Sequence, residues 1–234
     1  MEKMTLAEAI ASAFGAKTWA IILPAIYDTL YMVLFTTLLT AFFGILLGML
    51  LVVINPDGIY PCRRLSAVIG AIVNGLRSLP SIIVIILTLP LSRMIIGVSY
   101  GPKACIIALS VTCIPMFGRL VESSIMEVQQ GKIEAARSVG AKNSQIVLKV
   151  MIPEALPSLI RSFTVTVIVV ISTTAIAGML GAGGLGDVAV RFGYNRFKTD
   201  ILIAAVLVMI VMVQAIQVIG DGISKSVLKK RHLL

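Results

Sequence analysis

The sequence predicts an all-α polytopic membrane protein with five transmembrane helices. Of its 234 residues, 58% are hydrophobic and only 13% are charged, whereas charged residues make up roughly 25% of an ordinary soluble domain. Several runs contain no charged residue over about the 20 positions that a bilayer-spanning helix needs. This composition excludes a soluble enzyme, and it excludes an intrinsically disordered chain, which would be poor in apolar residues.

Three of the predicted spans lie in runs without any charge, at residues 29–54, 162–186 and 201–220. The middle run is expected to leave the membrane where its glycines cluster. Two weaker spans each contain an arginine near one end, Arg93 or Arg119, whose side chain can reach toward the membrane interface. Residues 65–76 are apolar but too few to cross, so we assign them to an interfacial helix. The five predicted spans are 29–54, 79–96, 104–121, 162–180 and 201–220.

The basic residues predict which way the chain crosses the membrane. Thirteen Lys and Arg residues fall on one side of the predicted spans and seven on the other. Because cytoplasmic loops are enriched in Lys and Arg, we place the long loop 122–161 and the basic C-terminal tail 221–234 in the cytoplasm and the N-terminus outside. The net charge of +9 does not indicate a nucleic-acid partner, since the basic residues lie between apolar runs rather than along one face.

The first 24 residues do not form a convincing signal peptide, because they lack a basic start followed by an apolar core and a small-residue cleavage site. Leu6, Ile10, Ala13 and Phe14 recur at helical spacing. This periodicity predicts a short helix that lies on the outer membrane surface.

The interiors of the predicted spans contain no residue that could couple transport to an ion gradient. Ion-coupled carriers use intramembrane Asp, Glu or His, and none of these occurs there. The chain also lacks the GxxxxGK(S/T) loop that binds nucleotide phosphates, since Gly131 and Lys132 are followed by Ile133. We therefore expect no catalytic residue, no cofactor and no metal in this chain. If ATP is the energy source, another polypeptide binds ATP and magnesium.

Small and uncharged polar residues stand out inside the predicted spans. Ser172 and Thr173 lie near the middle of the fourth span. Their hydroxyls either bond back to their own helix and pack against neighbours, or line a path for a neutral or zwitterionic solute, and both alternatives stay open. Gly44 and Gly48 form a GxxxG pattern in the first span, which predicts close packing against another helix.

A glycine-rich run follows the fourth span at residues 181–186. It reads as GxGxxG, but a dinucleotide-binding site needs a β-strand before that pattern, and here a predicted membrane helix precedes it. Glycine allows positive φ and sharp turns, and non-helical backbone at membrane depth is tolerated where it is buried in protein or faces water. Gly181, Gly183, Gly184 and Gly186 therefore predict a re-entrant turn at the outer mouth of a pathway.

The predicted cytoplasmic loop contains a second motif, Glu134, Ala135, Ala136, Arg137 and, three positions later, Gly140. The pattern predicts a helix, a turn and a second helix, with Gly140 ending the first helix at positive φ and Asn143 or Ser144 capping the second. One interpretation is an ordinary hairpin in which Glu134 and Arg137 form a solvated pair. The other is a protrusion whose small alanines seat deeply in the groove of a partner protein.

This motif resembles the EAA loop of ABC importer permeases, in which EAA is followed by three residues, a glycine, nine residues and I-x-L-P. Matching residues stand in register, and Val150 and Ile152 replace the usual isoleucine and leucine; the matches are Glu134, Ala135, Ala136, Gly140 and Pro153. Together with residues 73–80, 119–122, 153–157 and the glycine run, the loop is similar to the permease of the bacterial methionine importer, the MetI family. The resemblance covers roughly residues 29–228.

The MetI resemblance implies a type I ABC importer permease fold in the bacterial inner (cytoplasmic) membrane, and a homodimer of five-span subunits. It also implies an ABC ATPase dimer that docks on the EAA loop, and an extracytoplasmic substrate-binding (lipo)protein that delivers L-methionine or D-methionine. In that family a residue of the fourth span forms a narrow gate, and the matching position is Ile176. The expected pathway residues are thus Ile176, Ser172 and Thr173.

Two alternative functions stay open from the sequence. The same architecture would also serve another small solute, such as a methionine-containing dipeptide, cystine or an osmoprotectant, because related permeases share both motifs. A stand-alone channel or ion-coupled carrier is the alternative from another class, and the lack of charge inside the predicted spans argues against it.

Overall fold

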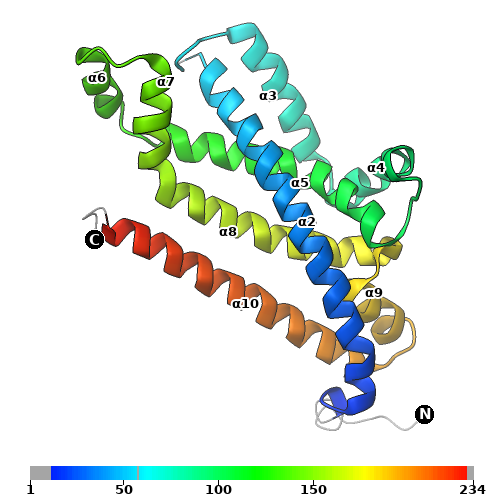
Figure 1. Cartoon of the computed structure of the whole chain (residues 1–234). Coiled ribbons are helices and arrows are strands. Elements are labelled where there is room, and N and C mark those ends of the chain that lie inside the picture. The colour runs from blue at the N-terminus through cyan, green and yellow to red at the C-terminus, as the bar shows by residue number, and fades with distance from the viewer. Residues whose placement is uncertain (1–11, 57, 231–234) are drawn as a thin grey trace. The chain divides into compact units, whose positions relative to one another are not determined.

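Helices account for nearly all of the chain that the computed structural model describes, residues 12–56 and 58–230 (Figure 1). The longer helices are α2 (Ala16–Ile54), α3 (Arg63–Ser78), α4 (Ser81–Ile96), α5 (Gly101–Met126), α8 (Ile152–Ala177) and α10 (Thr199–Lys230). The shorter ones are α6 (Gln130–Ser138), α7 (Asn143–Ile146) and α9 (Gly184–Val188). Three π-helical segments follow α7, α8 and α9 respectively: η1 (Val147–Met151), η2 (Gly178–Ala182) and η3 (Ala189–Tyr194). The predicted all-α class is confirmed.

Four helical segments are long and apolar enough to cross a membrane: α2, α5, the continuous segment Asn143–Ala182 and Thr199–Lys229 of α10. The pair α3 and α4 meets the same criteria when its two helices are taken together, with a bend of 109° between them. The described part of the chain therefore contains up to five membrane-crossing elements, the number expected from the sequence.

The region 65–96 forms two separate helices, α3 and α4, with the break close to where the sequence places it. α4 has 16 residues, which at 1.5 Å per residue extend over about 24 Å, less than the roughly 30 Å hydrocarbon core of a bilayer. α4 alone is therefore too short for the predicted span 79–96. Residues 65–76, expected as a separate interfacial helix, lie in α3, the other half of the bent pair. Pro80 stands at the bend, where it disfavours helical backbone at Leu79 and offers no N–H to continue α3.

α2 begins earlier than the predicted first span. Its 39 residues start at Ala16, so residues 16–24 belong to this long helix. The short helix predicted from the spacing of Leu6, Ile10, Ala13 and Phe14 would lie before Ala16, and Leu6 and Ile10 lie outside the described residues. A charge-free run thus identified the part of the helix that suits lipid, but not where the helix starts.

The helices beside the predicted cytoplasmic loop and tail are longer than expected. α5 continues to Met126 and α8 starts at Ile152, so both extend into the loop predicted at 122–161. α10 continues to Lys230, which puts most of the predicted tail 221–234 in a helix. Residues 231–234 of that tail lie outside the described part of the chain.

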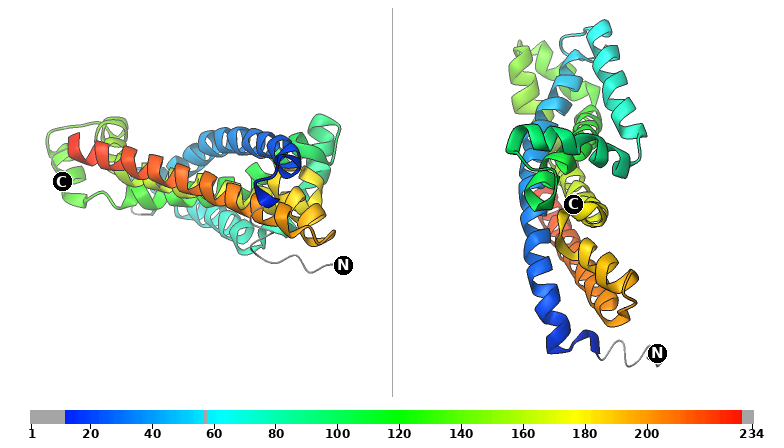
Figure 2. Two further views of the ribbon diagram at one scale, coloured as in Figure 1. Left: turned by 90° about the horizontal axis from the view of Figure 1, so that it is seen from below. Right: turned by 90° about the vertical axis from the view of Figure 1, so that its right-hand side faces the viewer.

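The chain forms two compact units, each assembled from three stretches. The first comprises Met1–Leu38, Leu79–Thr112 and Val167–Ile216, and the second comprises Leu39–Ser78, Cys113–Thr166 and Gln217–Leu234. In the first unit, α9 and the start of α10 lie side by side (Figure 2) and share a buried core with the start of α2. The buried residues of this core are Ala13, Ile22, Ala25, Leu185, Val188, Ala189, Ile201, Ala204 and Ala205.

The second unit has its core where α5 meets α6, α7 and the start of α8. Val121 and Ile125 of α5 pack in one buried cluster with Ile133 of α6, Ile146 of α7 and Ala155 of α8. α6 and α7 thus share the core of the α5 and α8 ends that they connect.

α2 approaches α5 closely in the second unit. A Cβ atom at Gly48 would lie 2.6 Å from the Gly118 carbonyl oxygen, and one at Gly44 would lie 2.6 Å from Phe117 Cδ1. Real Cβ atoms do not approach other atoms so closely, so the two helices pack at a distance that only glycine permits. The GxxxG pattern marks close helix packing, as predicted.

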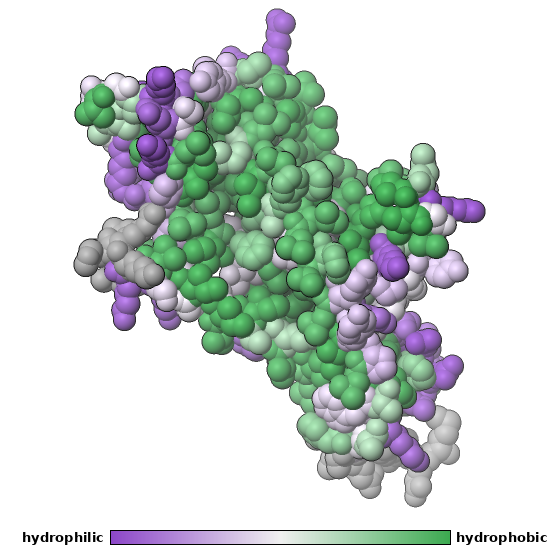
Figure 3. Space-filling model, in the orientation of Figure 1, coloured by the Kyte–Doolittle hydropathy of each residue, from purple (hydrophilic) through white to green (hydrophobic). Residues whose placement is uncertain are grey.

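Exposed apolar side chains cover long parts of the helix surfaces. On α2, Leu34, Leu38 and Phe42 are each more than half exposed, and Figure 3 shows hydrophobic residues over most of the face in view. Hydrophilic residues gather over α6 and α7 in the same view. A soluble monomer rarely exposes so large an apolar surface, so lipid or another protein covers these helices.

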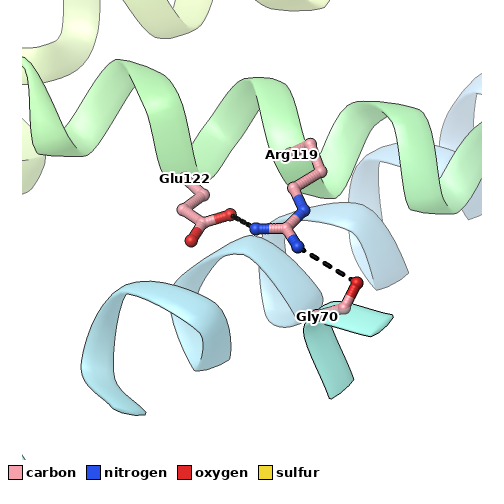
Figure 4. Close-up of polar contacts among 3 residues, drawn as sticks. All are labelled: Gly70, Arg119 and Glu122. Carbon is pink, nitrogen blue, oxygen red and sulfur yellow. Dashed lines mark hydrogen bonds and ion pairs between the residues drawn. The ribbon is translucent and has the colours of Figure 1, made fainter. Parts of the chain in front are cut away.

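α3 is tied to α5 by a charged residue. Arg119 Nη1 lies 2.6 Å from Glu122 Oε2, and Arg119 Nη2 donates a hydrogen bond of 3.2 Å to the Gly70 carbonyl oxygen of α3 (Figure 4). The Arg119 and Glu122 side chains are only 23% and 13% exposed. The guanidinium thus turns toward Glu122 and α3, whereas the sequence had indicated that it reaches toward the membrane interface.

Replacing Arg119 by Met should lower the free energy of unfolding by about 2 kcal/mol, because a mostly buried carboxylate loses its partner. The double variant Arg119→Met/Glu122→Met should recover most of that loss, since it leaves no unpaired charge. The measurement is denaturant unfolding of the purified protein in detergent, with the exposed residue Arg77→Met as a control. A single variant as stable as the double variant would contradict this role for Arg119.

Candidate functional site

α6 presents most of the EAA motif on its exposed side. Ile133 is buried in the core of the second unit and Ala136 is half-buried against it, whereas Glu134, Ala135 and Arg137 are exposed. Because residues three apart lie on one face of a helix, Ile133 and Ala136 fix α6 to the protein by one face. In the described part of the chain Glu134 and Arg137 form no ion pair with each other, so the predicted solvated pair is not formed, and both side chains are available to a partner.

Gly140 ends the first helix of the motif as predicted. Its φ is +80°, a conformation that glycine adopts at little cost. The Gly140 N–H donates to the Arg137 carbonyl oxygen at 2.9 Å, and the Ala141 N–H donates to the Ala136 carbonyl oxygen at 3.1 Å. These two bonds form a Schellman motif, which satisfies carbonyl groups at the end of α6.

The predicted cap of the second helix was wrong. Lys142 is the residue that precedes α7, and Asn143 is already the first residue of the helix. The Lys142 N–H donates to Gln145 Oε1 at 2.9 Å, so the side chain of Gln145 does the capping from three positions further along the chain. α7 then continues through η1 into α8 without a break, and Pro153 lies in the first turn of α8.

Polar contacts that the sequence did not predict tie α6 and the end of α5 to α8. Lys132 Nζ of α6 forms an ion pair with Glu154 Oε1 of α8. The Ser158 hydroxyl of α8 donates to Glu127 Oε2 at 2.9 Å and to Ser124 Oγ of α5 at 3.2 Å. These groups border a polar cavity of about 300 Å³. The ion pair and the shared core thus attach α6 to the start of α8.

The expected pathway residues of α8 fall on two different sides of the helix. Ser172 is exposed and its hydroxyl donates back to the Ile168 carbonyl oxygen at 3.1 Å. Ile176 is half-exposed and stands one turn further on the same face, which ends with the exposed Met179. Thr173 is buried and its hydroxyl donates to the carbonyl oxygens of its own helix. The structure therefore brings Ser172 and Ile176 together with Met179, and it separates Thr173 from them.

The glycine run makes the predicted sharp turn. Gly181, Gly183 and Gly184 have φ values of +85°, +81° and +77°, and they reverse the chain between η2 and α9. Gly186 is required for its lack of a side chain and not for its φ, because a Cβ atom there would lie 2.4 Å from the Ala175 carbonyl oxygen of α8. Gly178 is its counterpart: a Cβ atom at this position would lie 2.4 Å from the Asp187 backbone nitrogen. The backbones of α8 and α9 thus touch, and Gly178, which precedes the predicted run, is part of that contact.

α2 contacts this glycine turn through Thr29 and Asp28. The Thr29 hydroxyl accepts a hydrogen bond of 2.9 Å from the Leu185 N–H, near the start of α9, and donates one of 2.9 Å to the Ala25 carbonyl oxygen. The neighbouring Asp28 carboxylate comes within 3.4 Å of the position that a Cβ atom on Gly183 would take. Neither residue was predicted to belong to the site, because each lies more than 150 positions before the turn that it contacts.

The described residues hold no group of three or more His, Cys, Asp or Glu side chains that could bind a metal ion. The features that stand out are therefore an exposed helix ending at Gly140, an apolar helix face with one hydroxyl, and a glycine turn held by Thr29. None of them resembles a catalytic constellation.

The family of this chain follows from a match over most of its length. A family model described as the binding-protein-dependent transport system inner membrane component matches residues 44–232. The chain belongs to this family. It is a multi-pass inner-membrane permease, the non-catalytic membrane component of an ABC importer, with the type I permease fold expected from its EAA loop.

Individual relatives of this permease are similar over nearly their whole length. It is 45% identical over 206 residues to the methionine import system permease protein MetP of Bacillus subtilis, covering 88% of this chain and 93% of the relative. It is 40% identical over 207 residues to the probable D-methionine transport system permease protein MetI of Vibrio cholerae, covering 88% and 92%. A solved chain of the inward-facing MetNI methionine ABC transporter matches with a TM-score of 0.88 and 34% identity, covering 92% of this chain and 99% of that chain.

Gly186→Ala should abolish transport and lower the yield of folded permease, because a Cβ atom cannot fit against the backbone of α8. A cost of about 3 kcal/mol or more is expected, since the clash is with backbone that cannot rotate away. The measurement is solute uptake by cells together with the amount of monodisperse protein after detergent extraction. Gly222→Ala, where a Cβ atom meets nothing within 4 Å, is the matched control. A normally active Gly186→Ala variant would contradict the close contact of α8 and α9.

Proposed function

We propose that this permease imports methionine into the cytoplasm, with L-methionine as the expected substrate and D-methionine as a further one. The observation that carries the proposal is the agreement of the whole fold with the methionine ABC transporter, at a TM-score of 0.88 and 34% identity. Relatives with methionine in their names, matched over more than nine-tenths of their own length, support the same substrate.

The proposed assembly is a homodimer of this chain with an ATPase dimer on the cytoplasmic side and an extracytoplasmic binding protein on the other. α6 is the proposed contact with the ATPase, through the exposed side chains of Glu134, Ala135 and Arg137 around the half-buried Ala136. Its small residues allow a groove to close around it, and the turn at Gly140 sets where the contact ends. ATP and magnesium would be bound by the ATPase. The C-terminus and the EAA loop would lie in the cytoplasm and the N-terminus outside.

In this proposal the attachment of α6 to α8 couples nucleotide binding by the ATPases to movement of the permease. When nucleotide binding closes the ATPases, α6 would move with them, and the Lys132–Glu154 pair would transmit that movement to α8. In this proposal the permease has two states, one in which the path is open to the cytoplasm and one in which it is open to the outside. Both states exist before nucleotide binds, and the ATPase shifts their populations.

The proposed path follows the exposed face of α8 that carries Ser172 and Ile176. One neutral hydroxyl among apolar side chains suits a zwitterion with an apolar side chain better than an ion. Ile176 is the proposed gate residue, and Met179 continues its face with a flexible apolar side chain. Thr173 was expected on this path, but its burial favours a packing role. The glycine turn at Gly181, Gly183, Gly184 and Gly186 would form the outer mouth.

Deleting the gene should abolish saturable uptake of labelled L-methionine in a strain that has no other methionine importer. Unlabelled L-methionine should compete best, ahead of methionine-containing dipeptides, cystine and glycine betaine. D-methionine should compete as well if one pathway serves both enantiomers. Unchanged methionine uptake in that strain would refute the substrate, and the competitor that the gene does affect would then identify the solute.

Ala135→Asp should abolish uptake while the permease still inserts into the membrane, because a charged side chain would occupy the face that docks into the ATPase. Ala135→Ser, which adds one hydroxyl without charge, is the matched control and should keep most of the activity. Copurification of the ATPase with each variant measures docking directly. Full transport by the Ala135→Asp variant would contradict the role of α6.

A further inference from the structure

A cavity of about 380 Å³ lies between the first part of α2 and the start of α5, within the first unit. Its lining includes Tyr27, Asp28, Tyr31, Tyr100, Pro102 and Lys103. We propose that this cavity is a binding site for a zwitterionic amino acid with an apolar side chain, where the permease holds its substrate before transport. This inference rests on the proposed function for the identity of the amino acid.

The cavity contains one charged group of each sign. Asp28 is half-buried on α2 and Lys103 is exposed at the start of α5. Neither side chain has an ion-pair partner within residues 12–56 and 58–230, and the two do not pair with each other. An α-amino acid carries an ammonium and a carboxylate group, so Asp28 would accept from the ammonium and Lys103 would donate to the carboxylate.

The start of α5 adds to the preference for a carboxylate beside Lys103. Gly101 begins the helix with a φ of +83°, and Pro102 follows it within the first turn. The first N–H groups of a helix have no partner inside the helix, and the positive end of the helix dipole lies there. An anionic group in the cavity would therefore meet Lys103 and this helix end together.

Three of the five tyrosines of the chain line this one cavity. Tyr27 and Tyr31 stand one turn apart on α2, and Tyr100 lines the same cavity from the segment before α5. A tyrosine ring offers an apolar surface together with a hydroxyl, and thioether sulfur makes favourable contacts with aromatic rings. The aromatic wall therefore suits an apolar side chain, whereas a binding site for a purely ionic solute would not need it.

The position of the two charges along their helices agrees with this role. Asp28 directly precedes the charge-free run 29–54, and Lys103 directly precedes the charge-free residues 104–118. Both groups thus stand at the end of an apolar stretch, where a membrane helix meets water. The glycine turn adjoins them, since a Cβ atom on Gly183 would lie 3.4 Å from Asp28 Oδ2 and 3.9 Å from Pro102 Cγ. A bound amino acid would therefore lie next to the turn that follows the Ile176 face.

Equilibrium binding of labelled L-methionine to the purified permease complex, without its binding protein, tests the proposal. Asp28→Asn and Lys103→Gln should each weaken the binding of methionine by about tenfold or more, the usual effect of losing one hydrogen bond to a charged group. Asp28→Asn should not weaken the binding of 4-methylthiobutanoate, which lacks the ammonium. Lys103→Gln should not weaken the binding of methionine methyl ester, which lacks the carboxylate charge. Asp221→Asn and Lys225→Gln, exposed on α10, are the matched controls.

The outcomes separate this inference from the proposed function. If cells take up methionine through this permease but both variants bind methionine as tightly as the wild type does, the cavity proposal is overturned and the substrate assignment stands. A variant that weakens the binding of methionine and of its own analogue equally also overturns it, because that pattern reflects damage to the fold. If methionine uptake does not depend on the gene and another apolar amino acid shows the same pairing of Asp28 with ammonium and Lys103 with carboxylate, the cavity proposal stands and the substrate changes.

Discussion

Close contact between helix backbones is the constraint on which this permease depends. In a bilayer, helices gain little by packing leucine against leucine, because lipid tails are as apolar as the side chains. Glycine lets backbones approach until dispersion forces and weak backbone contacts hold them. α2 meets α5 in this way at Gly48, and α8 meets α9 at Gly178 and Gly186. α10 packs closely on a side chain of α8, where a Cβ atom on Gly220 would lie 2.1 Å from Thr164 Oγ1.

Hydrogen bonds and ion pairs between helices add to the close packing at the glycines, and each of them joins two different helices. The Thr29 hydroxyl satisfies the Leu185 N–H near the start of α9, a backbone donor that lipid could not satisfy. Arg119 joins α3 to α5, and Lys132 joins α6 to α8. Because the Lys132 and Glu154 side chains are partly exposed, their attraction is modest and screened by salt. The buried contact of Ile133 with the core of the second unit is therefore the stronger attachment of α6.

A structural feature could be predicted from the sequence where its residue type has few possible roles, and could not be predicted where it depends on contacts between distant segments. Gly140 and the glycine run were predicted because glycine at the end of a helical pattern has few roles other than a turn. The break between α3 and α4 was predicted but not the angle of 109°, since a test of length and hydropathy treats the two halves of a bent element as unrelated segments. Asn143 was expected to cap α7 by residue type, but Gln145 supplies that hydrogen bond. Thr29, Gly178 and the Lys132–Glu154 pair depend on contacts that only the folded chain brings together.

The glycines of the EAA loop and of the glycine turn are needed for two different physical reasons, and the reason decides which residues can replace each one. At Gly140 and Gly181 a Cβ atom would meet nothing within 4 Å, so only the torsion angle φ is restrictive, and asparagine is a tolerable replacement there. At Gly178 and Gly186 the torsion angles are ordinary and the restriction is the distance between two backbones. No side chain of any shape satisfies that second condition. Among descendants of this permease, asparagine can therefore replace glycine at positions 140 and 181, while the spacing of α8 and α9 keeps glycine at positions 178 and 186 for as long as the fold itself persists.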